Sequence, residues 1–164
     1  MTRRQTELGY LVGVGLAAGV VGTAIISALQ AFDERYAPKT IPPTTQDPAD
    51  FMVQRAERLA QVEGKVPKAV EKSAMLMTRT GYGTMFGVLY GLWHGPKTCR
   101  RPVVDGVLLG SLVYLAGYLG WLPALGLSKP VWRQSFPQIM GELARHLVYG
   151  VTTTAVYGLI DEAA

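Results

Sequence analysis

The sequence predicts an all-α membrane protein with four transmembrane helices and a short amphipathic helix in the loop between the first two. Three observations predict this fold: a charge-free apolar run near the N-terminus, a row of glycines spaced by four in a second apolar segment, and small-residue rows in two more. Each interior glycine costs a helix in water about 1 kcal/mol relative to alanine, whereas in lipid it lets two helix backbones approach closely. We therefore expect one integral-membrane domain over residues 1–164.

The composition argues against several classes of function. Hydrophobic residues make up 49% of the chain, an average that combines apolar segments with one long polar connection. The net charge of +4 is modest and the basic residues are interspersed with acidic ones, which does not favour nucleic-acid binding. The single cysteine, Cys99, excludes an internal disulfide and is better interpreted as inert than as a metal ligand.

The first membrane helix is predicted over residues 8–32, an uncharged run long enough to cross a hydrocarbon core of about 30 Å. A cleaved signal peptide is the alternative, because Arg3 and Arg4 precede the run, but the run is too long for the apolar part of such a peptide. Small residues share one face of this helix: Gly15, Ala18, Gly19 and Gly22. This row can pack against a second row elsewhere in the chain.

Residues 33–73 form a long polar loop. The proline-bearing stretch 38–43 cannot be helical throughout, so the chain leaves the bilayer here. Asp47 before Pro48 is a typical helix start, and apolar residues then recur at helical spacing until Gly64. This pattern predicts a short amphipathic helix, lying either on the membrane surface or, as an ordinary solvated helix, over the end of the bundle.

The second membrane helix is predicted over residues 74–95 and carries a glycine-zipper row: Gly83, Gly87, Gly91 and Gly95. A spacing of four puts these glycines on one face, which we expect to pack against the row of the first helix. Arg79 lies about one turn inside this helix and can extend its charge toward the surface.

The third membrane helix is predicted over residues 103–122, with packing glycines at Gly106 and Gly110. Asp105 follows Arg101 by one turn, and we interpret the two as a local ion pair in preference to an ion site. Pro123 is expected to end or kink this helix.

The fourth membrane helix, predicted over residues 138–160, carries the candidate functional residues Glu142, Arg145 and His146. An ionisable group at the centre of a membrane costs about 2.5–3.5 kcal/mol, so such groups usually have a partner or a function. We favour structural pairing of Glu142 with Arg145 or His146. A proton- or ion-responsive site is an alternative, since histidine titrates near neutral pH. A metal site is another, although a glutamate and a histidine would supply only two ligands. The same face continues as Gly150, Thr154 and Gly158.

Four spans place the Glu142 turn on the same side as the polar loop. Short basic flanks indicate that both termini are cytoplasmic, namely Arg3, Arg4, Lys97, Arg100 and Arg101.

Three short motifs make the chain resemble the YagU-like family of small bacterial inner-membrane proteins: Ile41-Pro42-Pro43, Pro123-Ala-Leu-Gly126-Leu127, and Glu142 followed by His146-Leu-Val148. The resemblance implies a location in the bacterial inner membrane, an unassigned activity and a link to acid resistance. It also implies that Glu142 and His146 are candidate functional positions. Members of the family carry further histidines in the middle helices, where this chain has Gly or Tyr.

No phosphate-binding loop, nucleophile elbow or metal-ligand set is recognisable in the sequence, so we expect no enzyme, cofactor or metal. We expect a structural or interaction role, including that of an accessory subunit, with the lipid bilayer and a membrane protein or a second copy as partners. The alternative is a proton- or ion-responsive protein that uses Glu142 and His146 in acid stress. We favour the first because small-residue rows recur along the chain and no helix shows a continuous polar path.

Overall fold

The computed structural model describes residues 3–95 and 101–163. Within these ranges the chain is all-helical, as predicted, apart from one isolated bridge between Thr44 and Ser128. The longer helices are α1 (Arg3–Tyr36), α2 (Pro48–Leu59), α3 (Lys68–His94), α4 (Pro102–Tyr114) and α6 (Phe136–Ala163). The short elements are η1 (Pro38–Thr40), η2 (Leu115–Trp121), α5 (Leu122–Ala124) and η3 (Val131–Arg133).

Two helical segments are long and apolar enough to cross a membrane, namely Glu7–Tyr36 and Pro102–Ala124. This is a statement of length and composition, which core helices and signal sequences can also satisfy. The helices α3 and α6 do not meet the same measure, so composition accounts for two of the four predicted spans.

The helix boundaries extend beyond the predicted apolar runs. α1 covers residues 3–36 where 8–32 was predicted, and α3 begins at Lys68 where residue 74 was predicted. The hydrogen-bonded helix continues because polar residues propagate a helix as well as apolar ones do. Asp47 caps α2 as predicted, since its side chain accepts from the backbone N–H groups of Ala49 and Asp50 at 2.8 and 3.4 Å.

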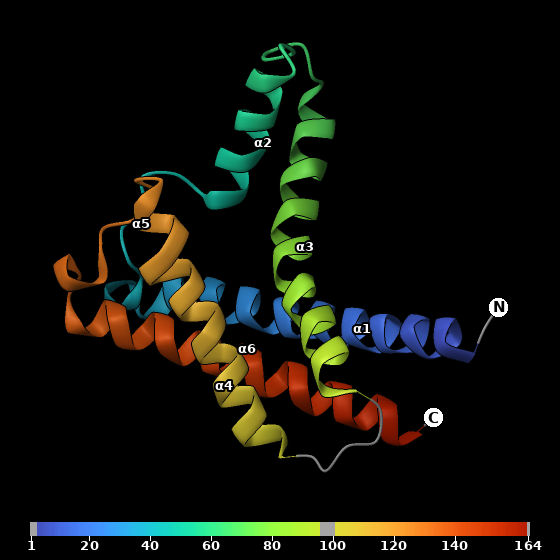
Figure 1. Cartoon of the computed structure of the whole chain (residues 1–164). Coiled ribbons are helices and arrows are strands. Elements are labelled where there is room, and N and C mark those ends of the chain that lie inside the picture. Colours follow the sequence, from blue (N-terminus) through green and yellow to red (C-terminus); the bar gives the residue numbers. More distant parts are fainter. Residues whose placement is uncertain (1–2, 96–100, 164) are drawn as a thin grey trace.

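The helices α1 and α6 run antiparallel and side by side, and they form the base of the fold (Figure 1). α3 packs on α1, α4 packs on α6, and α2 lies beside the first half of α3 in a hairpin that projects from the other helices. The hydroxyl of Tyr10 donates to Asp161 at 2.9 Å near one end of the α1–α6 pair, and Asp33 contacts Arg145 near the other. The first and last helices are therefore held together at both ends.

The glycine rows of α1 and α3 face each other at backbone contact. A Cβ atom added at Gly15 would lie 2.6 Å from the carbonyl oxygen of Gly87, and one added at Gly91 would lie 2.8 Å from that of Leu11. Gly83 faces the Thr23 side chain in the same row, and Gly19 faces the backbone of Thr84. These contacts extend over about three turns, which only residues without a side chain allow.

The predicted row does not continue to Gly95. This residue follows the last turn of α3 as its C-cap, with a left-handed φ of 72° that favours glycine.

The rows of α4 and α6 meet in the same way. A Cβ atom at Gly106 would lie 2.7 Å from the backbone nitrogen of Val151, and one at Gly150 would lie 2.5 Å from that of Gly110. Gly158 is buried one row further along α6. The close approach of these two helices therefore depends on glycine in both partners.

The third predicted span is not one regular helix. Residues Leu115–Trp121 form a π-helical segment, and Gly120 within it has non-helical dihedrals of −97° and −108°. The kink comes before Pro123, because a proline ring clashes with the carbonyl four residues earlier and cannot donate the hydrogen bond that would close that turn. A widened turn upstream accommodates both effects, and such turns are frequent at functional sites.

Candidate functional site

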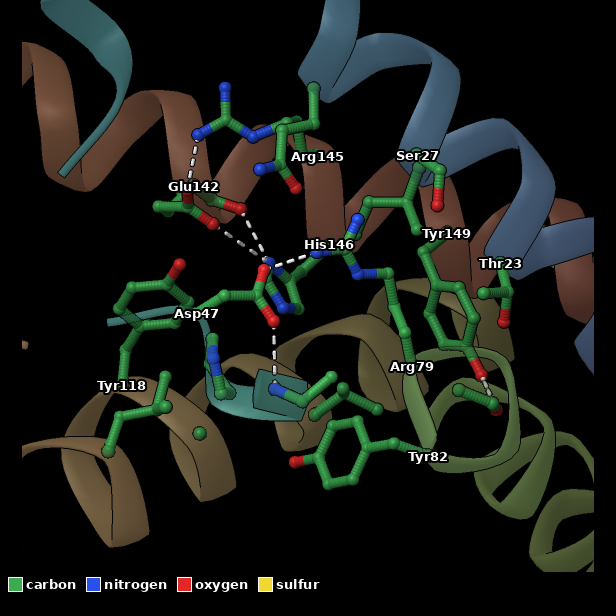
Figure 2. A pocket seen from close by; sticks show the side chains of 18 of the residues that line it. Thr23, Ser27, Asp47, Arg79, Tyr82, Tyr118, Glu142, Arg145, His146 and Tyr149 are labelled. Carbon is green, nitrogen blue, oxygen red and sulfur yellow. Dashed lines mark hydrogen bonds and ion pairs between the residues drawn. The ribbon is translucent and has the colours of Figure 1, made fainter. Parts of the chain in front are cut away.

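An open cavity of about 590 Å³ lies at the end of the bundle that carries α2. It is lined by residues of α1, the loop before α2, α2, α3, α4, η2, α5 and its following loop, and α6. All three candidate functional residues, Glu142, Arg145 and His146, are in this lining (Figure 2). Its volume falls in the range of about 300–1,000 Å³ that is usual for small-molecule pockets. The structure thus places these residues in the wall of a cavity.

Arg145 connects two carboxylates in one buried cluster. Its Nη1 donates to Asp33 of α1, while Nη2 donates to Glu142 and, at 3.3 Å, to the backbone oxygen of Thr40. The Arg145 side chain is only 4% exposed and that of Glu142 only 9%. Buried charges persist when they are paired and hydrogen-bonded in this way.

Sequence reasoning placed Glu142 with Arg145 but missed Asp33. The sequence offered only an indirect indication of this contact: four predicted spans of alternating direction place the end of the first helix and the start of the fourth on the same side of the membrane.

His146 lies next to this cluster with a defined tautomer. Its Nδ1 is 2.8 Å from the backbone oxygen of Glu142. Because a carbonyl oxygen can only accept a hydrogen bond, Nδ1 carries the proton, and in the neutral ring Nε2 carries the lone pair. The ring meets Tyr114 and Tyr118 edge-on, each with a centroid distance of 5.7 Å. Tyr118 also lies beside the Glu142 side chain (Figure 2). The histidine therefore sits between a carboxylate and two phenol rings (Figure 2).

The mouth of the cavity is closed on one side by an ion pair. Arg79 of α3 donates to Asp47, the residue that caps α2. Deeper inside, the indole nitrogen of Trp121 donates to the Tyr82 hydroxyl at 3.1 Å, which links η2 to α3. The sequence predicted that Arg79 extends toward the membrane surface. In the structure its ion pair with Asp47 connects α3 to the start of α2.

A second polar cluster lies at the opposite end of the bundle. Asp105 is 3.3 Å from Nε2 of His94 and 3.4 Å from the hydroxyl of Tyr90. The predicted pairing of Asp105 with Arg101 is replaced by this contact with α3, because the first turn of α4 lies beside the last turn of α3. Among the described residues, no group of three or more His, Cys, Asp or Glu side chains is arranged to hold a metal ion.

The buried face of α6 carries polar atoms about one turn apart, although Tyr149 and Tyr157 also belong to the hydrophobic core and the Thr153 hydroxyl has no hydrogen-bond partner within the described part of the chain. Its buried non-glycine residues include Glu142, Arg145, Tyr149, Thr153, Tyr157 and Asp161. The spacing of three or four residues puts them in one column. The sequence analysis did not identify this column, because uncharged tyrosine and threonine residues between glycines are common in membrane helices.

Comparison with family models, curated proteins and solved structures gave no match. The resemblance to the YagU-like family therefore remains an expectation based on the motifs.

Proposed function

We propose that this chain is a four-span protein of the bacterial inner membrane with a structural or interaction role. The observation that carries the proposal is the kind of side chain that α3 and α6 expose. On α6 between residues 140 and 160 the exposed residues are apolar: Met140, Ala144, Val148 and Leu159. Its buried face is the polar column described above. A helix in water shows the reverse pattern, with its apolar stripe facing the core.

The second half of α3 also exposes apolar side chains. Its large exposed residues are Met85, Leu89, Leu92 and Trp93, and Trp93 is 77% exposed. Its buried face consists of two glycines and two aromatic residues, Phe86 and Tyr90. Lipid solvates such an apolar surface without cost, whereas water does not. These exposed apolar side chains support membrane insertion of α3 and α6, in addition to the two segments that are long and apolar enough to cross a membrane.

A structural role fits the state of the charged groups in the cavity wall. Arg145, Glu142 and Asp33 are bound to one another, and they connect the last helix to the first. The glycine rows are used inside the fold, so the surface available to another membrane protein is the exposed apolar face of α3 and α4. Purification in a mild detergent, with identification of the proteins that co-migrate, tests this role. A monodisperse chain without any partner or second copy would count against it.

A proton-responsive function is a second candidate, favoured by the polar column of α6. The column has a carboxylate near each end, Glu142 and Asp161, and hydroxyl-bearing side chains between them. Proton transfer along the column would need bridging water, because the hydroxyls of Tyr149 and Tyr157 donate to the carbonyl oxygens of Gly83 and Gly95 and not to one another. The family resemblance, with its link to acid resistance, points the same way. Proton flux into proteoliposomes of the purified chain is the direct test.

A further inference from the structure

We propose that the cavity at the α2 end of the bundle binds a lipophilic organic cation. This goes beyond the structural role, because it assigns a ligand to the cavity whatever partner the outer surface takes. Three properties of the cavity carry the proposal: the charge in its wall, its aromatic rings and its apolar remainder.

The ion cluster that Glu142 and Arg145 of the wall form with Asp33 carries an unbalanced negative charge when His146 is neutral, although Asp33 itself is not part of the lining. Asp33 and Glu142 are both paired with the one guanidinium of Arg145, so this cluster has two acids and one base. Asp47 and Arg79 balance each other at the mouth. An uncompensated charge in apolar surroundings is expensive, and a bound monocation would compensate it.

Four aromatic side chains line the cavity. Tyr82 comes from α3, Tyr118 and Trp121 come from η2, and Tyr149 comes from α6. The faces of such rings attract organic cations, most strongly where water is excluded. Tyr118 and Glu142 lie on the same side of the cavity, so that ring and carboxylate face it together (Figure 2).

The rest of the lining is suited to an apolar body attached to the cation. It includes Ile26, Met52, Val113, Leu122 and Leu125. A compact hydrated metal ion would gain nothing from these side chains, whereas a cation that carries aryl or alkyl groups would bury them.

An anionic ligand fits less well, because both guanidinium groups are occupied. The Arg145 side chain is 4% exposed and donates to three oxygens. Arg79 donates to Asp47 at the mouth. A phosphate or carboxylate would have to displace an existing oxygen to reach Arg145, and at Arg79 it would lie at the exposed mouth beside the Asp47 carboxylate.

Equilibrium dialysis of the purified full-length chain in an uncharged mild detergent tests the proposal. The probes are tetraphenylphosphonium and tetraphenylborate, which share a shape and differ in the sign of their charge. After subtraction of binding to protein-free micelles, we expect one phosphonium per chain, bound at least tenfold more tightly than the borate. Equal binding of both ions, preference for the borate or no binding of the phosphonium would each overturn the proposal.

Substitutions on α3 locate the binding without changing any charge. Thr78 lines the cavity, whereas the neighbouring Met77 is 74% exposed outside it. We expect Thr78→Trp to fill the cavity and abolish phosphonium binding, and the matched Met77→Trp to leave it unchanged. Glu142→Gln, which neutralises the cluster, should weaken phosphonium binding at least tenfold. Unchanged binding in Thr78→Trp would place the phosphonium elsewhere and refute the assignment, even if the Glu142 variant did not fold.

Discussion

Asp33 at the end of α1 and Arg145 in α6 form an ion pair although they are 112 positions apart in the sequence. The same guanidinium binds Glu142, so one cationic side chain holds two carboxylates at the meeting point of the first and last helices. Removing the cation would leave two buried acids close together with no partner between them.

We expect Arg145→Gln to lower the free energy of unfolding by about 3–5 kcal/mol, the usual cost of removing one partner from a buried ion pair. Reversible unfolding in mixed micelles would measure the loss. Arg58→Gln is the matched control, because Arg58 is an exposed residue of α2. Adding Asp33→Asn to the Arg145 variant should recover part of the loss, since it removes one of the unpaired acids. Equal unfolding of Arg145→Gln and the control would contradict this account.

Gly87→Leu or Gly91→Leu should prevent normal folding or assembly. A Cβ atom at Gly87 would lie 2.7 Å from the Cα atom of Gly19, so α1 and α3 would have to separate. The matched substitution on the same helix is Gly81→Leu, because a Cβ atom there meets nothing within 4 Å. Leu89→Ile, at an exposed position, should also be tolerated. Size-exclusion profiles and melting temperatures of the variants would show the difference, and a normally folded Gly91→Leu protein would refute the packing face.

Two substitutions in the cavity separate the structural role from the proton-responsive one. In the structural role, Glu142→Gln removes the negative charge that Arg145 binds and lowers the melting temperature. His146→Gln lowers it less, because the lost hydrogen bond contributes about 1 kcal/mol to the free energy of unfolding. Neither change then affects proton flux, because the parent protein has none. In the proton-responsive role, both variants keep the parental melting temperature and lose flux. Melting curves and proteoliposome flux should be measured on the same preparations.

The proposed orientation can be tested with thiol labelling in intact cells. Cys99 lies outside the described residues, as do Lys97 and Arg100, and the predicted topology puts all of them on the cytoplasmic side. A membrane-impermeant reagent should therefore leave Cys99 unlabelled. Lys65→Cys in a Cys99→Ser background supplies the positive control, because Lys65 is exposed in the polar loop on the other side. Strong labelling of Cys99 together with weak labelling of the Lys65 variant would reverse the orientation.

The packing faces of single helices could be predicted from residue spacing, whereas the contacts between particular helices could not. The spacing of Gly15, Gly19, Gly87 and Gly91 indicated the faces of α1 and α3 that meet, because each row lies within one helix and has a steric purpose. The contact between Asp33 and Arg145 depends on which helices become neighbours, and no local pattern encodes that. The pairing of Asp105 with His94 escaped prediction for the same reason.

Two features within single helices differ from the prediction for reasons that a hydropathy pattern does not contain. Pro123 is visible in the sequence, but the way its backbone strain spreads into a π-helical turn at Leu115–Trp121 depends on the surrounding packing. Tyr149, Thr153 and Tyr157 are uncharged and stand among apolar residues and glycines, so their burial on one face was not apparent. Only the pattern of exposure in the folded chain distinguishes that face from the apolar one.

The pairing of α1 with α6 also has a consequence for biosynthesis. The ribosome delivers Asp33 early, and its partner Arg145 emerges only after the intervening helices have been made. Domains of a nascent chain generally fold from the N-terminus onward, yet here α1 can pair with α3 well before its second large partner, α6, has been made. An intermediate that ends before α6 would hold the α1–α3 glycine contact while leaving the Asp33 carboxylate and the row at Gly106 and Gly110 uncovered. Such intermediates would be natural substrates for membrane chaperones and quality-control proteases, and a nonsense mutation between the end of α4 and residue 136 would leave the cell with a chain in that state.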